Sequence, residues 1–546
     1  MFSKNFLFLT IGFFCASIFS CKKKEEFVNP TSENISESAD YKVSPDGKIK
    51  LGDKLENPYA IEVMQTAFDR LKKSSRASDV EESPVRLTHY YVRFLPADWT
   101  EYNNLKSDTT LNLYDIPLDY SIELHGNSYH DPSIPEDKPT WQYTSVNKDY
   151  QFPRIKYEIL SNLYIPESDT TINANNLNPA RNGYAKKSFK DVLIDEAMIL
   201  TKNYDDTLKP RAQNARYNPV GIIRVWDTRL GRNIPLVGVN VRARRWFTYS
   251  NTTTNGDGWF QTGSFDRDVN YALFFQTGQF DVRTGTYGQA WIDGPKTSSP
   301  WIHDIGTDVN GFYAHVFRGA YRYHYGNIDG LKRPGVWSAI KYCAYDKNED
   351  EANGEFWGNW DPTGLTPDIK IWRYISNRLK DSDEIFSTTI HETAHASHAQ
   401  LLNKKGIGML TVKNTIVESW AVAVQWQITA MEYRERGIPD FAGVNYFNTN
   451  IDRLQYAFQD WNRNMKSPYP YTSLFIDLID DYNQVGKFQN AISDNVKGYT
   501  LAGIESTFLH NVNGIDTWIG SLKKQLKNNK PTGVTDGQID ELIDQF

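Results

Sequence analysis

The feature that most constrains this chain is a stretch that places two histidines on one face of a helix. The run His-Glu-Thr-Ala-His at 391–395 lies in a segment whose apolar residues recur at helical spacing, namely Ile385, Phe386, Ile390, Ala394, Leu401 and Leu402. The capping-box sequence at 381–384 predicts the helix start, and Gly406 predicts its stop. Residues four apart share a helix face. His391 and His395 can therefore direct two imidazoles at one metal ion, although two structural histidines on a partly buried helix are the alternative.

Zinc suits such a pair of imidazoles. Neutral imidazole nitrogens bind Zn²⁺ at about 2.0–2.1 Å, and a catalytic site keeps one position for water. Glu392 is turned about 100° from His391 around the helix, so its carboxylate can accept a proton from that water as a general base. The sequence thus predicts Zn²⁺ as the cofactor and Glu392 as a catalytic residue.

A third protein ligand is expected, and two residues are candidates. His398 is three positions past His395 but seven past His391, which is about 10 Å further along an unbroken helix. Glu418 lies near the start of a second predicted helix, which Gly437 ends. Two helices joined by a short loop pack antiparallel, so the pattern favours Glu418 and leaves His398 as the alternative.

With His-Glu-x-x-His on one helix and a glutamate on the next, residues 381–437 resemble the gluzincin branch of zinc metallopeptidases. The resemblance implies a zincin-like catalytic domain that hydrolyses peptide bonds. Gluzincins often place a Tyr or His from a later segment over the metal to stabilise an oxyanion, which makes Tyr469 and Tyr471 candidates and Tyr471 the predicted catalytic residue. Many gluzincins also carry an acidic residue four positions past the ligand glutamate, where this chain has Val422.

The length of 546 residues predicts about three or four domains. Residues 51–215 read as a mixed α+β region of unknown role, and 286–546 as the catalytic domain, in which the strand at 369–372 is the candidate edge that binds substrate backbone. Short alternating strands with Gly and Asn turns over 216–285 are typical of a β-sandwich. That segment resembles the carboxypeptidase-regulatory-like sandwich, which implies a spacer or binding module. The expected fold is multidomain α+β: a mixed N-terminal region, a β-sandwich, then a mainly helical zincin-like metallopeptidase domain.

The N-terminus resembles a bacterial lipoprotein signal. An apolar run at 6–19 is too short for a stable membrane span and ends in Ser20-Cys21, followed by Lys and Glu residues. The resemblance implies a signal peptide at 1–20, acylation of Cys21, and a flexible tether at 21–50; a plain cleaved signal peptide is the alternative. The charged run after the cysteine resembles the export signal of surface lipoproteins in some Gram-negative bacteria. We therefore expect an outer-membrane lipoprotein exposed at the cell surface, held to the membrane by its lipid anchor only.

Composition argues against one class of partner, nucleic acids. The net charge is −7 and the Lys and Arg residues are dispersed, so the sequence gives no sign of the basic patch that binds nucleic acid. The lipoprotein setting, the accessory sandwich and the spacing to the distal glutamate resemble the enhancin-like peptidases that cut mucin glycoproteins. We expect a zinc-dependent peptidase acting on extracellular protein or glycoprotein substrates. The alternative is a non-catalytic surface lipoprotein that binds protein or glycan, and the presence of Glu392 argues against it because a non-catalytic zinc site needs no base.

Overall fold

The structure is a computed structural model, and residues 1–40 lie outside the residues that it describes. The described residues are 41–73, 82–166, 189–203, 217–335, 339–349, 353–356, 368–402, 413–441, 470–483, 485, 492–509 and 514–546. The predicted signal peptide, Cys21 and Tyr469 fall outside them. The described chain mixes sheets and helices, which confirms the α+β class. None of its helices is both long and apolar enough to cross a bilayer.

The N-terminal region combines two small antiparallel sheets with helices around two hydrophobic clusters. Residues 41–50, which the sequence assigned to a flexible tether, belong to this region instead. The Ser44 amide donates to the His125 carbonyl, and the side chain of Ile49 is buried in the core. Its strands are β1 (Lys50–Lys54) paired with β3 (Tyr120–Leu124), and β4 (Gln142–Asn147), β2 (His89–Leu95) and β5 (Lys156–Leu163) in one sheet; its helices are α1 (Ile61–Lys73), α2 (Trp99–Lys106) and α3 (Phe189–Leu200).

Two four-stranded sheets follow in the chain and share one core. In β6 every second side chain is buried, because alternate residues of a strand point to opposite faces. One sheet has the order β10 (Trp259–Gln261), β6 (Val220–Asp227) and β15 (Trp301–Ile305), with β7 (Arg232–Pro235) beside β6. The other has the order β14 (Trp291–Thr297), β11 (Val269–Phe274), β8 (Asn240–Arg245) and β9 (Thr248–Thr253). Ile223, Val241 and Leu273 are fully buried in the common core cluster.

Strand pairing does not follow the predicted boundary at residue 285. β14 and β15 lie beyond that residue and complete the two four-stranded sheets. β12 (Phe280–Thr284) lies before it and pairs in parallel with β16 (Ile340–Glu349). Local alternation in a sequence marks a strand but carries no information about its partner, which for β12 is a strand about 60 residues later in the chain. The two regions therefore interleave.

A mixed sheet supports the helices that carry the predicted site. Its order is β13 (Gly288–Gln289), β12, β16, β18 (Ile369–Ile375) and β17 (Gly354–Phe356), with β19 (Arg378–Leu379) beside β18. The predicted edge strand at 369–372 is wrong, because β18 has β16 on one side and β17 on the other. Buried Ile369 and Ile371 explain its interior position. The edge next to the helices is β17, whose three residues are too few to show any period.

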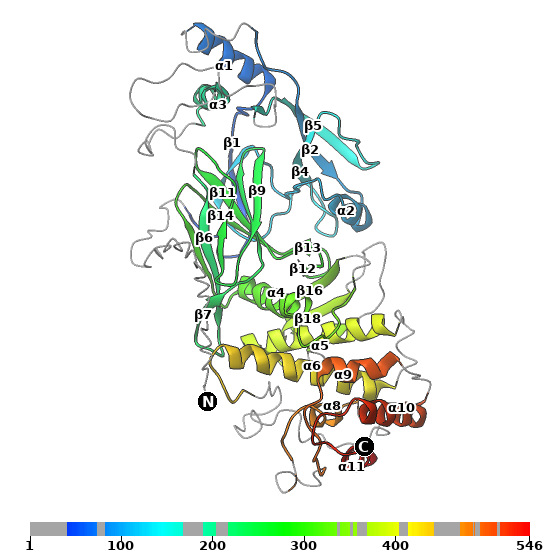
Figure 1. Cartoon of the computed structure of the whole chain (residues 1–546). Coiled ribbons are helices and arrows are strands. Elements are labelled where there is room, and N and C mark those ends of the chain that lie inside the picture. Colours follow the sequence, from blue (N-terminus) through cyan, green and yellow to red (C-terminus); the bar gives the residue numbers. More distant parts are fainter. Residues whose placement is uncertain are drawn as a thin grey trace, which may run out of the picture. The chain divides into compact units, whose positions relative to one another are not determined.

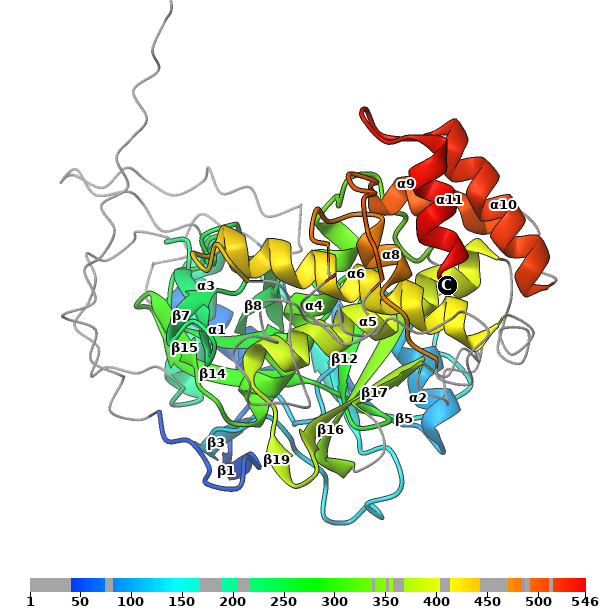
Figure 2. The same cartoon turned by 90° about the horizontal axis from the view of Figure 1, so that it is seen from below.

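Helices α4 (Val309–Tyr325) and α5 (Ser382–Leu401) pack against this sheet and against each other, and α6 (Asn414–Glu435) packs on α5 (Figures 1 and 2). The approach of α4 to α5 is close, since a Cβ on Gly319 would stand 2.9 Å from the Phe386 carbonyl oxygen. The capping box predicted for α5 is present, with Asp381 and Glu384 capping each other. Further helices along the chain are α8 (Leu474–Asp477), α9 (Leu501–Glu505), η3 (Ser506–Leu509), α10 (Ile515–Asn528) and α11 (Asp536–Asp544).

Candidate metal centre

Helices α5 and α6 bring three predicted ligands together. Nε2 of His391 lies 3.2 Å from Oε2 of Glu418 and 3.1 Å from Nε2 of His395. Nε2 of His395 lies 3.4 Å from the same Glu418 oxygen. His391 of α5 contacts Glu418 of α6, and Ser387, one turn earlier in α5, contacts Gln425, two turns later in α6. The two helices therefore run antiparallel, as the short connection predicts.

His398 does not belong to this group. Among the described residues, two groups place potential ligand atoms within 4.8 Å of one another, one formed by His391, His395 and Glu418 and the other by Asp477, Asp480 and Asp494, and His398 is in neither. The His398 side chain is buried, and burial, together with the neighbouring His395, lowers the pKa of its imidazole to about 3. α5 continues unbroken to Leu401, so His398 stays a turn away, and of the two candidate ligands only Glu418 lies with His391 and His395.

The three donor atoms fit a zinc-sized cation. In a tetrahedral site with ligands at about 2.0–2.1 Å from the metal, neighbouring ligand atoms are about 3.3 Å apart. The three separations of 3.1, 3.2 and 3.4 Å match that edge length. Two neutral imidazole nitrogens that face each other as acceptors repel, whereas a cation between them is bound by both. Two imidazoles and one carboxylate are also a donor set that catalytic zinc uses in proteins.

The carboxylate of Glu418 is held in its charged form. Burial opposes ionisation, but His395 and His391 in their protonated forms outweigh it and lower the pKa of Glu418 far below its ordinary value; a bound cation would favour the carboxylate in the same sense. A charged carboxylate is the form that binds a metal ion. It also offsets part of the charge of a divalent cation beside two neutral imidazoles.

Gln425 orients His391 from outside the cluster. Its Oε1 lies 2.9 Å from Nδ1 of His391, and its Nε2 donates to the hydroxyl of Ser387 at 2.7 Å. An amide oxygen only accepts, so Nδ1 of His391 carries the proton and Nε2 keeps its lone pair for the metal side. Sequence reasoning missed this residue because it looked for an acid at Val422. The available signal was helical spacing, since Gln425 is seven residues past Glu418 and so shares its helix face.

Glu392 faces a different wall of the site. A Cβ on Gly354 of β17 would stand only 2.8 Å from Oε1 of Glu392, so the glycine lets this edge strand pass directly over the carboxylate. Burial raises the pKa of Glu392 to about 8; His391 opposes that rise only when its imidazole is protonated, and Glu418 adds to it. Lys380 donates from Nζ to the carbonyl of Asn353 at 2.6 Å and fixes the residue before Gly354.

Tyr471 lies beside both acidic residues. Burial raises the pKa of its hydroxyl above the ordinary value, and the carboxylates of Glu418 and Glu392 raise it further. A hydrogen bond to Glu418 also favours the protonated hydroxyl. The structure thus brings the predicted Tyr471 to the cluster, in the segment just before α8.

Comparison with known proteins adds no relative: no protein-family model matches the chain, and a search of curated proteins finds no match. The interpretation of the site therefore depends on its own geometry. Helices α5 and α6 contribute three potential ligands and the buried carboxylate of Glu392. The edge strand β17 lies against that carboxylate, and the segment before α8 adds the protonated phenol of Tyr471.

Proposed function

We propose that this chain is a zinc-dependent peptidase of gluzincin type. The observation that carries the proposal is the convergence of His391, His395 and Glu418 at the edge lengths of a tetrahedral zinc site, with Glu392 buried next to a ligand histidine. A non-catalytic metal site has no need for that additional carboxylate. The zincin-like character of the helical region and the sandwich arrangement of the two four-stranded sheets are part of the same proposal.

A zinc ion held by His391, His395 and Glu418 would supply a Lewis acid that polarises the scissile carbonyl and acidifies water. Glu392 in its deprotonated form accepts a proton from the attacking water and delivers it to the leaving amine. Tyr471 keeps its proton at neutral pH, because its pKa is raised, and donates a hydrogen bond to the oxyanion. Gln425 holds His391 in the tautomer that binds metal.

The edge strand β17 suits an extended peptide. It pairs with β18 on one side, and its Gly354 lies against Glu392. The ring of Phe356 lies 6.4 Å from the ring of His395, which places the other end of β17 beside a proposed ligand. A substrate segment that adds to this edge by backbone hydrogen bonds would pass the catalytic carboxylate. Extracellular proteins or glycoproteins are the proposed substrates, and attachment through a lipidated Cys21 at the outer membrane is the proposed location.

The test is hydrolysis of casein and of a mucin by the purified chain and by Glu392→Gln. We expect cleavage that a chelator abolishes and added zinc restores. Glu392→Gln should keep its zinc and lose at least about 10²-fold in rate, the usual size of a general-base contribution. An equally active, zinc-loaded Glu392→Gln variant would exclude this mechanism. Zinc binding by a wild-type chain that cleaves neither substrate would favour a non-catalytic binding protein.

A further inference from the structure

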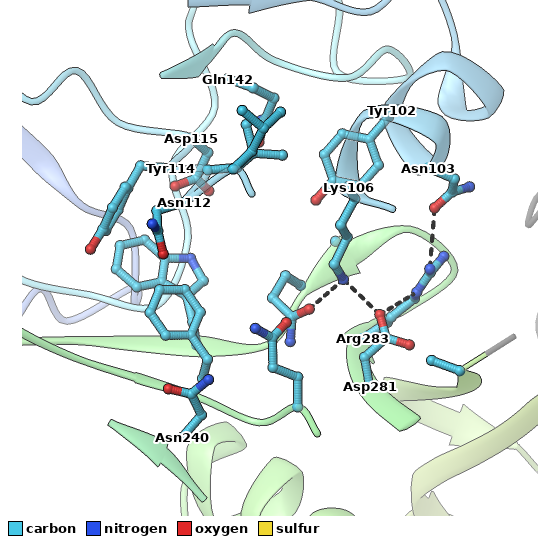
Figure 3. Close-up of a pocket in the computed structure, with 18 of the residues that line it drawn as sticks. Tyr102, Asn103, Lys106, Asn112, Tyr114, Asp115, Gln142, Asn240, Asp281 and Arg283 are labelled. Atoms are coloured by element: carbon cyan, nitrogen blue, oxygen red, sulfur yellow. Dashed lines mark hydrogen bonds and ion pairs between the residues drawn. The ribbon is translucent and has the colours of Figure 1, made fainter. Parts of the chain in front are cut away.

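A large cavity lies away from the metal centre, between α2 with its following loop and the strands β8, β12 and β13 (Figure 3). Its volume is about 1180 Å³, somewhat above the usual range of about 300–1,000 Å³ for small-ligand sites. We propose that this cavity binds a carbohydrate, as a recognition site separate from the metal centre. The residues that line it include none of the proposed metal ligands.

The two sites lie at opposite edges of one sheet. Asp281 and Arg283 of β12 and Gln289 of β13 line the cavity, whereas β17 at the other edge lies against Glu392. From β13 to β17 the sheet spans four strand spacings, or about 19 Å. A ligand in the cavity would therefore not touch the metal ligands, and a long substrate could occupy both sites at once.

One wall of the cavity is a rigid group of ionic side chains. Nζ of Lys106 donates to Asp281 at 2.6 Å and to Gln289, while Arg283 donates to Asp281 at 3.1 Å and to Asn103 at 3.1 Å (Figure 3). Burial would raise the pKa of Asp281, but the cations Arg283 and Lys106 lower it to about 2, so this carboxylate stays charged. Both cations bond Asp281, while Nη1 of Arg283 and Oδ1 of Asp281 have no partner among the described residues, so this wall offers a donor and an acceptor to a ligand's hydroxyl groups.

Unused hydrogen-bonding groups of both kinds face the cavity. Nε2 of Gln142 donates to two backbone carbonyls, and its Oε1 has no partner among the described residues. Oδ1 of Asn112 accepts from Asn251, and its Nδ2 has no partner in that part of the chain either. A hydroxyl group both donates and accepts. A ligand with several neighbouring hydroxyls satisfies amide donors and acceptors together, which a purely accepting anion cannot do.

Flat aromatic faces complete the lining. Trp99 stacks on Tyr287 with ring centroids 4.5 Å apart and an interplanar angle of 5°, and Tyr325 stacks on Tyr321 at 4.8 Å. Trp99, Tyr321 and Tyr325 line the cavity. Such rings offer apolar faces next to polar edges. The C–H faces of a sugar ring fit the aromatic faces and its hydroxyls fit the amides, whereas a lipid would leave the amides and charges unsatisfied.

The test is binding of the full chain to an array of defined neutral and acidic oligosaccharides, followed by calorimetry with the glycan that binds best. Trp99→Ala and Tyr325→Ala should each weaken binding at least about tenfold, since one aromatic platform is removed. Tyr157→Ala is the matched control: its side chain is 41% exposed against 40% for Tyr325, and its ring stacks on Phe152 at 4.2 Å, but it does not line the cavity. It should bind as the wild type does.

Glu392→Gln separates this proposal from the proposed function, because it should keep glycan binding while losing hydrolysis. Thermal melting of each variant shows whether a loss of binding reflects unfolding. The proposal is overturned if no glycan binds, if Trp99→Ala and Tyr325→Ala bind as the wild type does, or if Tyr157→Ala loses as much as they do. Binding of inorganic phosphate or of casein peptides that depends on Trp99, without glycan binding, would equally assign the cavity to another ligand.

Discussion

A single amide, that of Gln425, determines which nitrogen of His391 points at Glu418. Because the Gln425 oxygen accepts from Nδ1 and its nitrogen is engaged by Ser387, the imidazole has one orientation and one tautomer. A neutral partner of this kind orients the ligand without adding charge to the site. Nδ1 of His395 is buried and has no partner among the described residues, so Gln425 carries this role for only one of the two imidazoles.

The first prediction concerns that amide. Gln425→Leu keeps a similar volume and removes the acceptor, so zinc affinity should fall about 10–100-fold, the usual cost of losing an outer hydrogen-bond partner. Gln425→Glu keeps an acceptor and should bind zinc at least as well as the wild type. Competition with a chromophoric chelator measures both affinities. Equal affinity of Gln425→Leu and the wild type would show that His391 needs no such partner.

Some helices and strands of this protein can be predicted from the sequence, and others cannot. Helix α5 was predictable, since apolar spacing and a capping box both mark it, and the short loop predicted an antiparallel α6. Strand β17 was not predictable, because Gly354, Glu355 and Phe356 show neither alternation nor length. Its position follows from pairing with β18 and from contact with α5, which are non-local. The predicted edge strand, β18, is therefore the neighbour of the actual edge strand, β17.

The second prediction tests β17. Gly354→Ala adds a Cβ that would lie 2.8 Å from both Oε1 of Glu392 and Cγ2 of Thr388, so the strand or the carboxylate must move. We expect peptidase activity to fall at least about tenfold while zinc content is unchanged, and stability to drop by about 1–3 kcal/mol, the usual cost of overpacking. Gly256→Ala is the control, since its Cβ would meet nothing within 4 Å. Full activity of Gly354→Ala would mean that β17 does not constrain Glu392.

At the scale of the whole molecule, buried ion pairs join regions that are far apart in sequence. Arg318 of α4 donates to Asp227 at the end of β6 at 3.0 Å and to Glu432 of α6 at 3.1 Å. The hydroxyl of Tyr433 also donates to Asp227, at 2.9 Å. The four side chains are buried. The first strand of the four-stranded sheets is thus tied to two of the long helices, which is why a linear division at residue 285 does not describe the packing.

The third prediction follows from this network. Arg318→Met leaves the fully buried Asp227 without its guanidinium partner, while Glu432 keeps Arg436; breaking a buried pair in this way costs about 3–5 kcal/mol. Arg224→Met is the control, because Arg224 pairs with Asp304 where the two side chains are 33% and 40% exposed, and a salt bridge open to solvent contributes about 0–1 kcal/mol. Urea denaturation measures both. A loss below about 1 kcal/mol for Arg318→Met, or separate transitions for the sheets and the helices in the wild type, would contradict a shared core.

The measurement that tests the central claim most directly is zinc stoichiometry on Glu418→Ala and His398→Ala, purified in parallel with the wild type. His391, His395 and Glu418 approach one another at tetrahedral spacing, while His398 lies outside the cluster. The wild type and His398→Ala should therefore bind one zinc ion per chain, and Glu418→Ala should lose most of it, because metal binding requires the full ligand set. A His398→Ala protein that loses zinc while Glu418→Ala keeps it would contradict the metal centre described here.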